Sequence, residues 1–322
     1  MTVAVQRAGF ITTVQDLGRS ASRAHGVSLG GALDPHAMRI ANLLVGNEPS
    51  AAGLETTLGR VGLRFEDERA IAWCGGAVQV ELAGTPVSPG RLVTARRGDD
   101  LVIAVPERGA RAWLAISGGI DVPLVLGSRS TDLRAQFGGF EGRALRDGDV
   151  LPLGESTQFS SGSGVVASWG APEEWAMTGM RRPYLRFTRG ADWGRFRSGA
   201  HAAFSRSEFT VNDKADRMGA RLTGPTLARM DTDDLISEPV APGTIQVPPD
   251  GQPILLLGDC QTIGGYPKLA HVITVDMPIA AQLRPGDPVH FGEVSLEEAR
   301  ALYRARERDL NWFRAGVALR MR

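Results

Sequence analysis

Short apolar runs that end at Gly or Pro recur along the whole chain, and this punctuation limits the possible folds more than any other feature. The 322 residues include 40 glycines and 19 prolines. The runs at 78–82, 101–105, 112–116 and 272–275 have the length of single strands, and turn residues close each of them. Such spacing is typical of β-sandwiches and β-barrels rather than of strand–helix–strand units. We therefore predict a mainly β protein with few short helices.

One early segment carries helical signals instead. Asp34 is an N-cap residue, Pro35 suits the first helical position, and Gly46 supplies a stop. Apolar residues between them recur with the helical period. This pattern predicts a helix over residues 35–45.

Two short repeats indicate a duplication. Residues 63–65 read Leu-Arg-Phe, as do residues 185–187, and the Leu-Arg-Asp-Gly-Asp of 145–149 resembles 283–287. The intervals differ, so two similar barrels with unequal loops fit better than a tandem array. A Ser- and Gly-rich stretch at 156–172 suits the linker.

A capping box from Ser295 to Glu298 precedes a charged face and predicts a helix at the C-terminal end. The predicted organisation is an N-terminal segment over 1–50, a first barrel over 51–165, a second barrel over 166–294 and a helix over 295–322.

Composition excludes several classes of partner. The formal net charge is zero, which gives no reason to expect nucleic acid or an anionic membrane surface as a partner. No apolar run approaches the roughly 20 residues that span a bilayer. The N-terminus lacks the apolar core of a signal peptide, and two cysteines are too few for a disulfide scaffold. We expect a cytoplasmic protein.

The common nucleotide and metal signatures are absent from the sequence. It contains no phosphate-binding loop, no nucleophile elbow, no His-Glu-x-x-His and no Gly-x-Gly-x-x-Gly after a strand. The five histidines lack ligand spacing. We expect the chain to bind neither ATP nor a metal by itself.

Four polar clusters in Gly-rich settings are candidates for a site. Carboxamides and hydroxyls suit an amide or urea-like substrate, Arg can clamp a carboxylate, and Gly lets the backbone approach a ligand. The alternative for Asp16 with Arg19, and for Asp216 with Arg217, is a structural ion pair that fixes a turn. The clusters are residues 12–19, 126–139, 212–219 and 258–268.

The last cluster follows an apolar strand, 254–257, and contains one of only two lysines. Lys occurs at Lys214 and Lys268, so 34 of the 36 basic residues are Arg. A compact ammonium at Lys268 therefore suggests a specific role, although chance survival of two lysines explains it equally well.

Eight ordered motifs resemble one family, the KipA family, also called allophanate hydrolase subunit 2, the C subunit of 5-oxoprolinase or the biotin-dependent carboxyltransferase family. The resemblance runs from Val3 to about Glu293, and the chain is also similar to half of the carboxyltransferase domain of urea carboxylase. The motifs are TVQDLGR (13–19), GALD (31–34), ANLLVGN (41–47), GSRST (127–131), DRMG (216–219), IQVP (245–248), GGYPK (264–268) and QLRPGD (282–287).

The resemblance implies two cyclophilin-like β-barrels and a site shared with a KipI-like partner, the B subunit. It further implies a LamB/YcsF-like A subunit, with ATP driving the opening of 5-oxoproline to glutamate in the complex. Two other interpretations stay open. One is a carboxyltransferase-like protein that acts on urea or a related amide with biotin on another chain, and the other is a non-catalytic regulator that binds a KipI-like kinase inhibitor.

The family motifs also indicate the site residues. Cys260 and Ile263 depart from the family pattern, which leaves the substrate open. The residues predicted to be catalytic are Asp259, Gln261, Tyr266 and Lys268. Those predicted to bind substrate are Asp16, Arg19, Arg129, Ser130, Thr131, Arg217, Gln246, Thr262 and Gln282, and no metal ligand is predicted.

Overall fold

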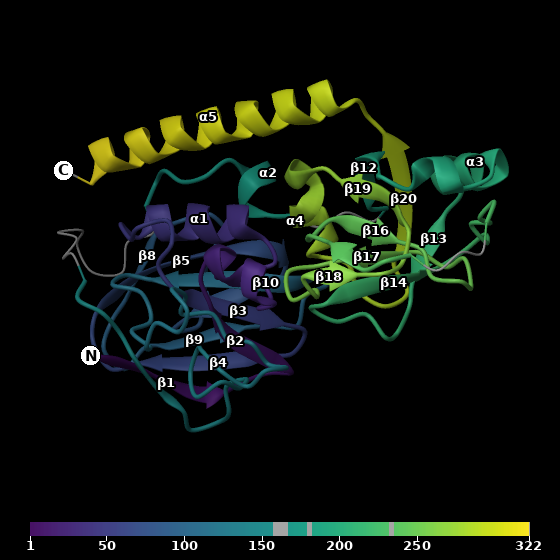
Figure 1. Cartoon of the computed structure of the whole chain (residues 1–322). Helices are drawn as coiled ribbons and strands as arrows, with labels where there is room; N and C mark the ends of the chain where they lie inside the picture. The colour runs from purple at the N-terminus through teal and green to yellow at the C-terminus, as the bar shows by residue number, and fades with distance from the viewer. Residues whose placement is uncertain (157–166, 179–181, 232–234, 322) are drawn as a thin grey trace. The chain divides into compact units, whose positions relative to one another are not determined.

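The computed structural model describes residues 1–156, 167–178, 182–231 and 235–321. The chain forms two compact units (Figure 1). The first unit consists of Met1–Arg19, Gly30–Gly179 and Asp309–Arg322, and the second consists of Ser20–Leu29 and Met180–Arg308. The domain boundary predicted between residues 165 and 166 lies outside the described residues.

The first unit contains two antiparallel sheets. One has the order β11-β1-β4-β9-β6-β7 and the other the order β2-β3-β10-β5-β8. The strands of the six-stranded sheet are β1 (Thr2–Arg7), β4 (Val61–Phe65), β6 (Val80–Leu82), β7 (Thr85–Pro86), β9 (Asp100–Ile103) and β11 (Val150–Pro152). Those of the five-stranded sheet are β2 (Ile11–Gln15), β3 (Gly53–Thr57), β5 (Arg69–Ala77), β8 (Val93–Ala95) and β10 (Arg108–Ile116).

The core of this unit lies between the sheets and beneath helix α1 (Pro35–Leu44). Strands β5 and β10 pair along their length and are buried almost throughout, as expected for strands covered on both faces. Helix α1 packs against both of them (Figure 1). The short helix α2 (Glu173–Ala176) packs against α1 and β5.

The helix predicted over residues 35–45 is confirmed. A side-chain oxygen of Asp34 accepts a hydrogen bond from the backbone N–H of Ala37 at 2.9 Å, which caps the first turn. Gly46 follows the last turn at φ +73°, a left-handed conformation that Gly adopts without strain.

The second unit is a closed seven-stranded barrel with the order β12-β19-β16-β17-β14-β13-β20. Closure comes from the parallel pairing of β12 with β20. The strands are β12 (Tyr184–Arg189), β13 (Phe209–Val211), β14 (Gly219–Thr223), β16 (Thr244–Gln246), β17 (Ile254–Leu256), β19 (Lys268–Val272) and β20 (Pro288–Glu293). A two-stranded ribbon is formed by β15 (Glu238–Pro239) and β18 (Ile263–Gly264).

Aromatic side chains fill part of this barrel. Phe204 of α3 (Ser198–Arg206) stacks on Phe291 with ring centroids 4.5 Å apart, and it contacts Phe187 and Phe209. Helix α3 thereby anchors itself to β12, β13 and β20. The other short helices are η1 (Ser20–His25), η2 (Trp193–Arg195), η3 (Thr274–Asp276) and α4 (Met277–Ala280).

The predicted mainly β class, with few short helices and a C-terminal helix, is confirmed. The strand predicted over 272–275 is wrong beyond its first residue, because β19 stops at Val272 and η3 begins at Thr274. Asp276 is buried in that turn and forms a bidentate pair with Arg186, while Pro278 lies in the first turn of α4. This ion pair between distant residues overrides the apolar local pattern.

The C-terminal helix α5 spans Leu296–Arg320. The hydroxyl of Ser295 accepts a hydrogen bond from the backbone N–H of Glu298 at 3.0 Å, as the capping box predicts. Its residues up to Arg308 belong to the second unit and those from Asp309 to the first. In the part of the chain that the structure describes, no helix is long and apolar enough to cross a membrane.

Candidate functional site

Four adjacent strands of the barrel align one residue each in a row across its outer face. Arg221 on β14 pairs with Ile254 on β17, Ile254 pairs with Gln246 on β16, and Gln246 pairs with Lys268 on β19. Residues paired across neighbouring strands point to the same face of a sheet. The row therefore presents a guanidinium, an apolar side chain and a carboxamide side by side, and the pairing with Lys268 follows a shift in register between Ile245 and Gln246.

The alternate positions of the same strands point into the barrel. Ala220, Leu222, Ile245 and Leu255 are each at most 1% exposed and form its interior. This alternation assigns Arg221, Ile254 and Gln246 to the outside. The alternation arises because apolar and polar residues alternate along β14 and β16.

A pocket of about 180 Å³ opens on this outer face. Its lining residues come from strands β14, β16 and β17 and from the loops after β13, β17 and β18. The lining residues are Lys214, Asp216, Met218, Gly219, Arg221, Gln246, Ile254, Leu256, Gln261 and Tyr266.

The carboxamides of Gln246 and Gln261 form a hydrogen bond in this pocket, which fixes their orientation. The Nε2 of Gln261 donates to Oε1 of Gln246 at 3.3 Å, and Nε2 of Gln246 donates to the carbonyl of Tyr266 at 3.2 Å. A Cβ at Gly264 would approach Nε2 of Gln246 to 2.7 Å, so a larger residue there would displace this carboxamide. The fixed carboxamides and the half-exposed phenol of Tyr266 offer donors and acceptors to an amide.

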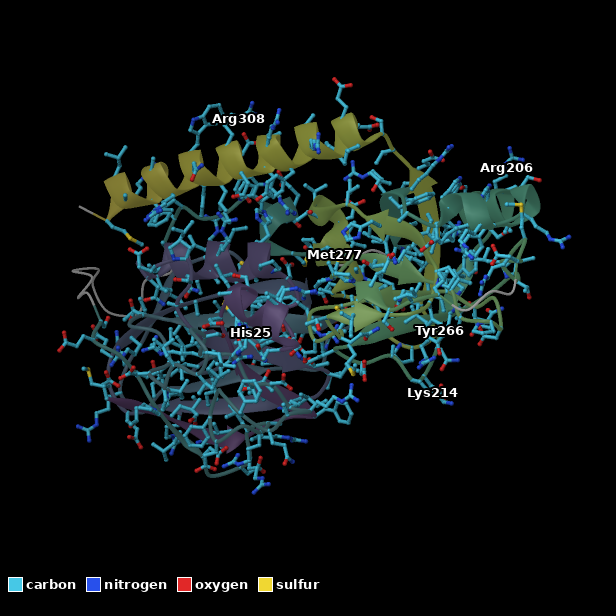
Figure 2. The ribbon with its side chains drawn as sticks, in the orientation of Figure 1. His25, Arg206, Lys214, Tyr266, Met277 and Arg308 are labelled. Atoms are coloured by element: carbon cyan, nitrogen blue, oxygen red, sulfur yellow. The ribbon has the colours of Figure 1, made fainter. Side chains whose placement is uncertain are left out.

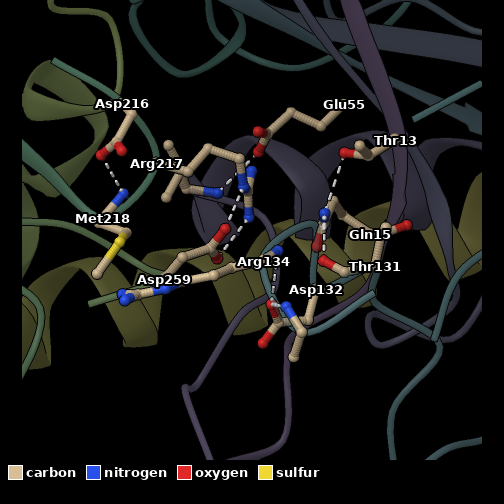
Figure 3. A network of polar contacts seen from close by, with 12 residues as sticks. Thr13, Gln15, Glu55, Thr131, Asp132, Arg134, Asp216, Arg217, Met218 and Asp259 are labelled. Carbon is tan, nitrogen blue, oxygen red and sulfur yellow. Dashed lines mark hydrogen bonds and ion pairs between the residues drawn. The ribbon is translucent and has the colours of Figure 1, made fainter. Parts of the chain in front are cut away.

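Asp259 forms a bidentate ion pair with Arg217 (Figure 3). The two nitrogen–oxygen distances are 2.8 and 3.0 Å, and the side chains are 11% and 8% exposed. Backbone bonds join the same segments, because Asp259 N donates to the carbonyl of Arg217 and Leu257 N donates to that of Met218. The pair ties the loop after β17 to the loop before β14, so it fixes two walls of the pocket.

Lys268 contacts two carboxylates. Its Nζ lies 2.5 Å from Oε2 of Glu238 on the ribbon and 3.6 Å from Oδ2 of Asp192, and the side chain is 14% exposed. Asp192 also accepts the backbone N–H of Lys268. The ammonium thus lies beside Gln246 in the row but is held by acidic partners.

Cys260 is fully buried next to Val240 and Leu256. Burial raises the pKa of its thiol to about 11, although nearby Arg23 acts in the opposite direction. At neutral pH the group is a protonated thiol, which is a poor nucleophile.

The predicted binding residues of the first unit form a second, buried network. Asp16 accepts four hydrogen bonds: from the hydroxyls of Ser128 and Ser130 at 2.6 Å, from Gly18 N at 2.7 Å and from Arg129 N at 2.6 Å. Its side-chain oxygens are therefore occupied by the loop at 128–130. The carboxylate of Asp16 therefore holds the loop at 128–130 in its conformation.

The two arginines of this network have structural contacts. Arg19 is 2% exposed, donates to the carbonyl of Ser130 and lies over the ring of Phe137 at 4.7 Å. Arg129 donates to the carbonyl of Val122 at 2.7 Å and pairs with Asp121 at 3.2 Å.

Gln15, which is not among the residues predicted from sequence, lies in the same network. Its Nε2 donates to Oγ1 of Thr13 at 3.0 Å and to the carbonyl of Thr131 at 3.2 Å (Figure 3). Thr131 itself is fully buried, and its hydroxyl donates to the carbonyl of Val14.

The remaining predicted residues lie outside the pocket lining. The carbonyl of Thr262 accepts a hydrogen bond from Val240 N, and Gln282 is 4% exposed after α4. The structure thus brings Gln246, Gln261 and Tyr266 together on the barrel.

Lys214 and Arg221 line the pocket but are not among the site residues predicted from sequence. The sequence did contain a signal that could have identified Lys214, because the chain has only two lysines. The sequence contained no signal for Arg221, since its place in one row with Gln246 depends on the pairing of three strands. Within the described residues, no group of three or more His, Cys, Asp and Glu side chains could hold a metal ion.

Comparison with known proteins gives a consistent set of relatives. The carboxyltransferase domain, subdomain A and B, matches residues 25–293. The C subunit of 5-oxoprolinase from Escherichia coli K12 is 43% identical over 293 residues, which is 91% of each chain. The protein of the same name from Haemophilus influenzae is 36% identical over 302 residues, 94% of each chain.

A solved structure agrees with these relatives. The crystal structure of Kluyveromyces lactis urea carboxylase matches with a TM-score of 0.89 at 30% identity, covering 97% of this chain and 29% of that chain. The present chain therefore corresponds to less than a third of that protein.

Proposed function

Because this chain belongs to the family of the carboxyltransferase domain, subdomain A and B, we propose that it is the C subunit of a 5-oxoprolinase complex. The observation that carries the proposal is the end-to-end match to two proteins of that name, which covers at least 91% of every chain involved. A likeness confined to one unit of the chain would support the fold alone.

The chemistry of the barrel pocket supports an amide substrate. Its carboxamides, from Gln246 and Gln261, and the phenol of Tyr266 can hydrogen-bond both the N–H and the C=O of a cyclic amide. Opening such a ring builds negative charge on the amide oxygen, which positioned donors stabilise. We propose that these residues orient the lactam, with Asp259 and Lys268 as further catalytic candidates.

A nucleotide-binding site must come from another component of the complex. No nucleotide-binding motif occurs in the 322 residues, so we propose that ATP binds on another component of the complex. The proposed partners are a KipI-like B subunit and a LamB/YcsF-like A subunit, in the cytoplasm. The chain on its own then neither hydrolyses ATP nor opens 5-oxoproline.

A second candidate is a carboxyltransferase-like protein that acts on urea with biotin attached to another chain. The observation that favours it is the TM-score of 0.89 against urea carboxylase, together with 32% identity to the urea amidolyase of Lachancea kluyveri. That relative is far longer, since this chain covers only 17% of it.

Reconstitution distinguishes the two candidates. The chain is combined with its KipI-like and LamB/YcsF-like partners, and glutamate and ADP are measured with 5-oxoproline as substrate. We expect both products only when all three proteins are present. A complex that is inert on 5-oxoproline but carboxylates urea with a biotin-carrying protein would contradict the proposal and support the alternative.

A further inference from the structure

A second pocket adjoins the first on the outer face of the barrel. It has a volume of about 370 Å³, and three residues, Lys214, Arg221 and Ile254, line both pockets. Figure 2 shows Lys214 and Tyr266 on one side of the second unit, with Arg206 apart from them on α3. Two cationic side chains therefore occupy the boundary between the pockets.

These two side chains differ from most other cations near the barrel. In the ranges that the structure describes, neither the ammonium of Lys214 nor the guanidinium of Arg221 has an ion pair or hydrogen bond. Only their backbones are engaged, both with Asn212: Lys214 N donates to Oδ1 at 3.0 Å, and the carbonyl of Arg221 accepts from Asn212 N at 2.8 Å. Cations of the same unit that have carboxylate partners are Arg186, Arg189, Arg195, Arg217, Arg229, Lys268 and Arg284.

The carboxylates that line the two pockets are engaged by their own loops. Oδ1 of Asp216 accepts the backbone N–H groups of Met218 at 2.8 Å and Gly219 at 3.1 Å. Oδ1 of Asp250, in the second pocket, accepts Gln252 N at 2.9 Å. Within the described residues, each pocket thus contains two cations and one anion, and of these charged side chains only the cations have no hydrogen bond or ion pair.

We propose that Lys214 and Arg221 bind the carboxylate of the substrate while the carboxamides of Gln246 and Gln261 hold its amide. The inference rests on the proposed function and assigns the residues that recognise the carboxylate of its cyclic amide substrate. Urea has no charged group and leaves both cations without a partner. Arg221 and Gln246 belong to the same row, on either side of Ile254, so both can face one bound molecule.

Kinetics of the assembled complex test this directly. Lys214→Met and Arg221→Met keep much of each side chain's length but remove its charge. A lost charge-assisted hydrogen bond typically weakens binding about tenfold or more. We expect the KM for 5-oxoproline to rise about tenfold in each variant, with kcat and the KM for ATP little changed. Arg206→Met, which removes an exposed cation on α3, is the matched control and leaves all three constants unchanged.

A binding measurement separates this inference from the proposed function. Ligand-observed NMR compares 5-oxoproline with 2-pyrrolidinone, the same lactam without the carboxylate, on the full chain. We expect the wild type to bind 5-oxoproline more tightly, and we expect both variants to lose that preference while the control retains it.

Each outcome bears on one of the two claims. A complex that makes glutamate with an unchanged KM in both variants overturns the carboxylate site and leaves the proposed function intact. A complex inert on 5-oxoproline removes the proposed function, and the NMR preference then decides the carboxylate site alone. Equal binding of the two lactams, or no binding of either, overturns the site.

Discussion

Cys260 lies at the centre of the polar loop after β17, yet its surroundings argue against a chemical role. The side chain is fully buried against Val240 and Leu256, and burial raises its thiol pKa to about 11 although Arg23 acts in the opposite direction. We expect Cys260→Ser to retain most of the turnover of the reconstituted complex, because no thiolate is present at neutral pH. Steady-state glutamate formation measures this. Complete loss of turnover with an unchanged melting temperature would indicate covalent catalysis instead.

Lys268 is the residue whose predicted catalytic role most needs a direct test. Its ammonium lies between Glu238 and Asp192, and an Arg can keep both ion pairs. We expect Lys268→Arg to melt at the wild-type temperature. If the compact ammonium is catalytic, turnover falls by about tenfold or more, which corresponds to the loss of one charged hydrogen bond. Wild-type turnover in this variant would contradict a catalytic role for Lys268 and indicate that it only forms ion pairs.

At the scale of elements, the seam between β16 and β19 contains a titratable group that couples stability to pH. Burial lowers the pKa of His271 from its ordinary value of 6.5, and its Nδ1 lies 3.3 Å from Oγ1 of Thr244. Between the lowered pKa and 6.5 the unfolded chain binds more protons than the folded chain. Stability therefore decreases as the pH falls through this window.

Urea unfolding at pH 7.5 and at pH 5.5 tests that coupling. We expect the free energy of unfolding to be lower at pH 5.5, and we expect His271→Gln to reduce the difference. His25→Gln, at an exposed histidine of the same unit, serves as the control. A pH difference that His271→Gln leaves intact would assign the effect to other groups.

The sequence was sufficient for elements whose signals are local. The helix at 35–45 was predictable because its cap, its first-turn proline and its stop are all within 13 residues. The start of α5 was predictable for the same reason. The end of β19 was not, because the buried pair of Asp276 with Arg186 joins residues 90 positions apart.

The same distinction applies to the candidate site. The polar loop at 258–268 could be identified from its composition and from the family resemblance, and Gln246, Gln261 and Tyr266 do line one pocket. The roles of Asp16 and Arg19 were ambiguous between ligand binding and structure, and the structure shows both in a buried network. Arg221 was missed because only strand register places it in one row with Gln246.

At the scale of the whole molecule, the two units have different architectures despite the short repeats between them. The second unit is a closed barrel, whereas the strands of the first unit form two sheets. The candidate pocket belongs entirely to the barrel. We therefore infer that the barrel surface is the part of this chain that meets the substrate.

The most direct test of that claim is the kcat/KM for 5-oxoproline of a complex carrying Gln261→Leu. This change keeps the size of the side chain but removes the hydrogen bond to Gln246 and the polar group offered to the lactam. We predict a fall of about tenfold or more with normal assembly of the complex. A wild-type kcat/KM in the fully assembled variant would contradict a substrate site on the barrel surface.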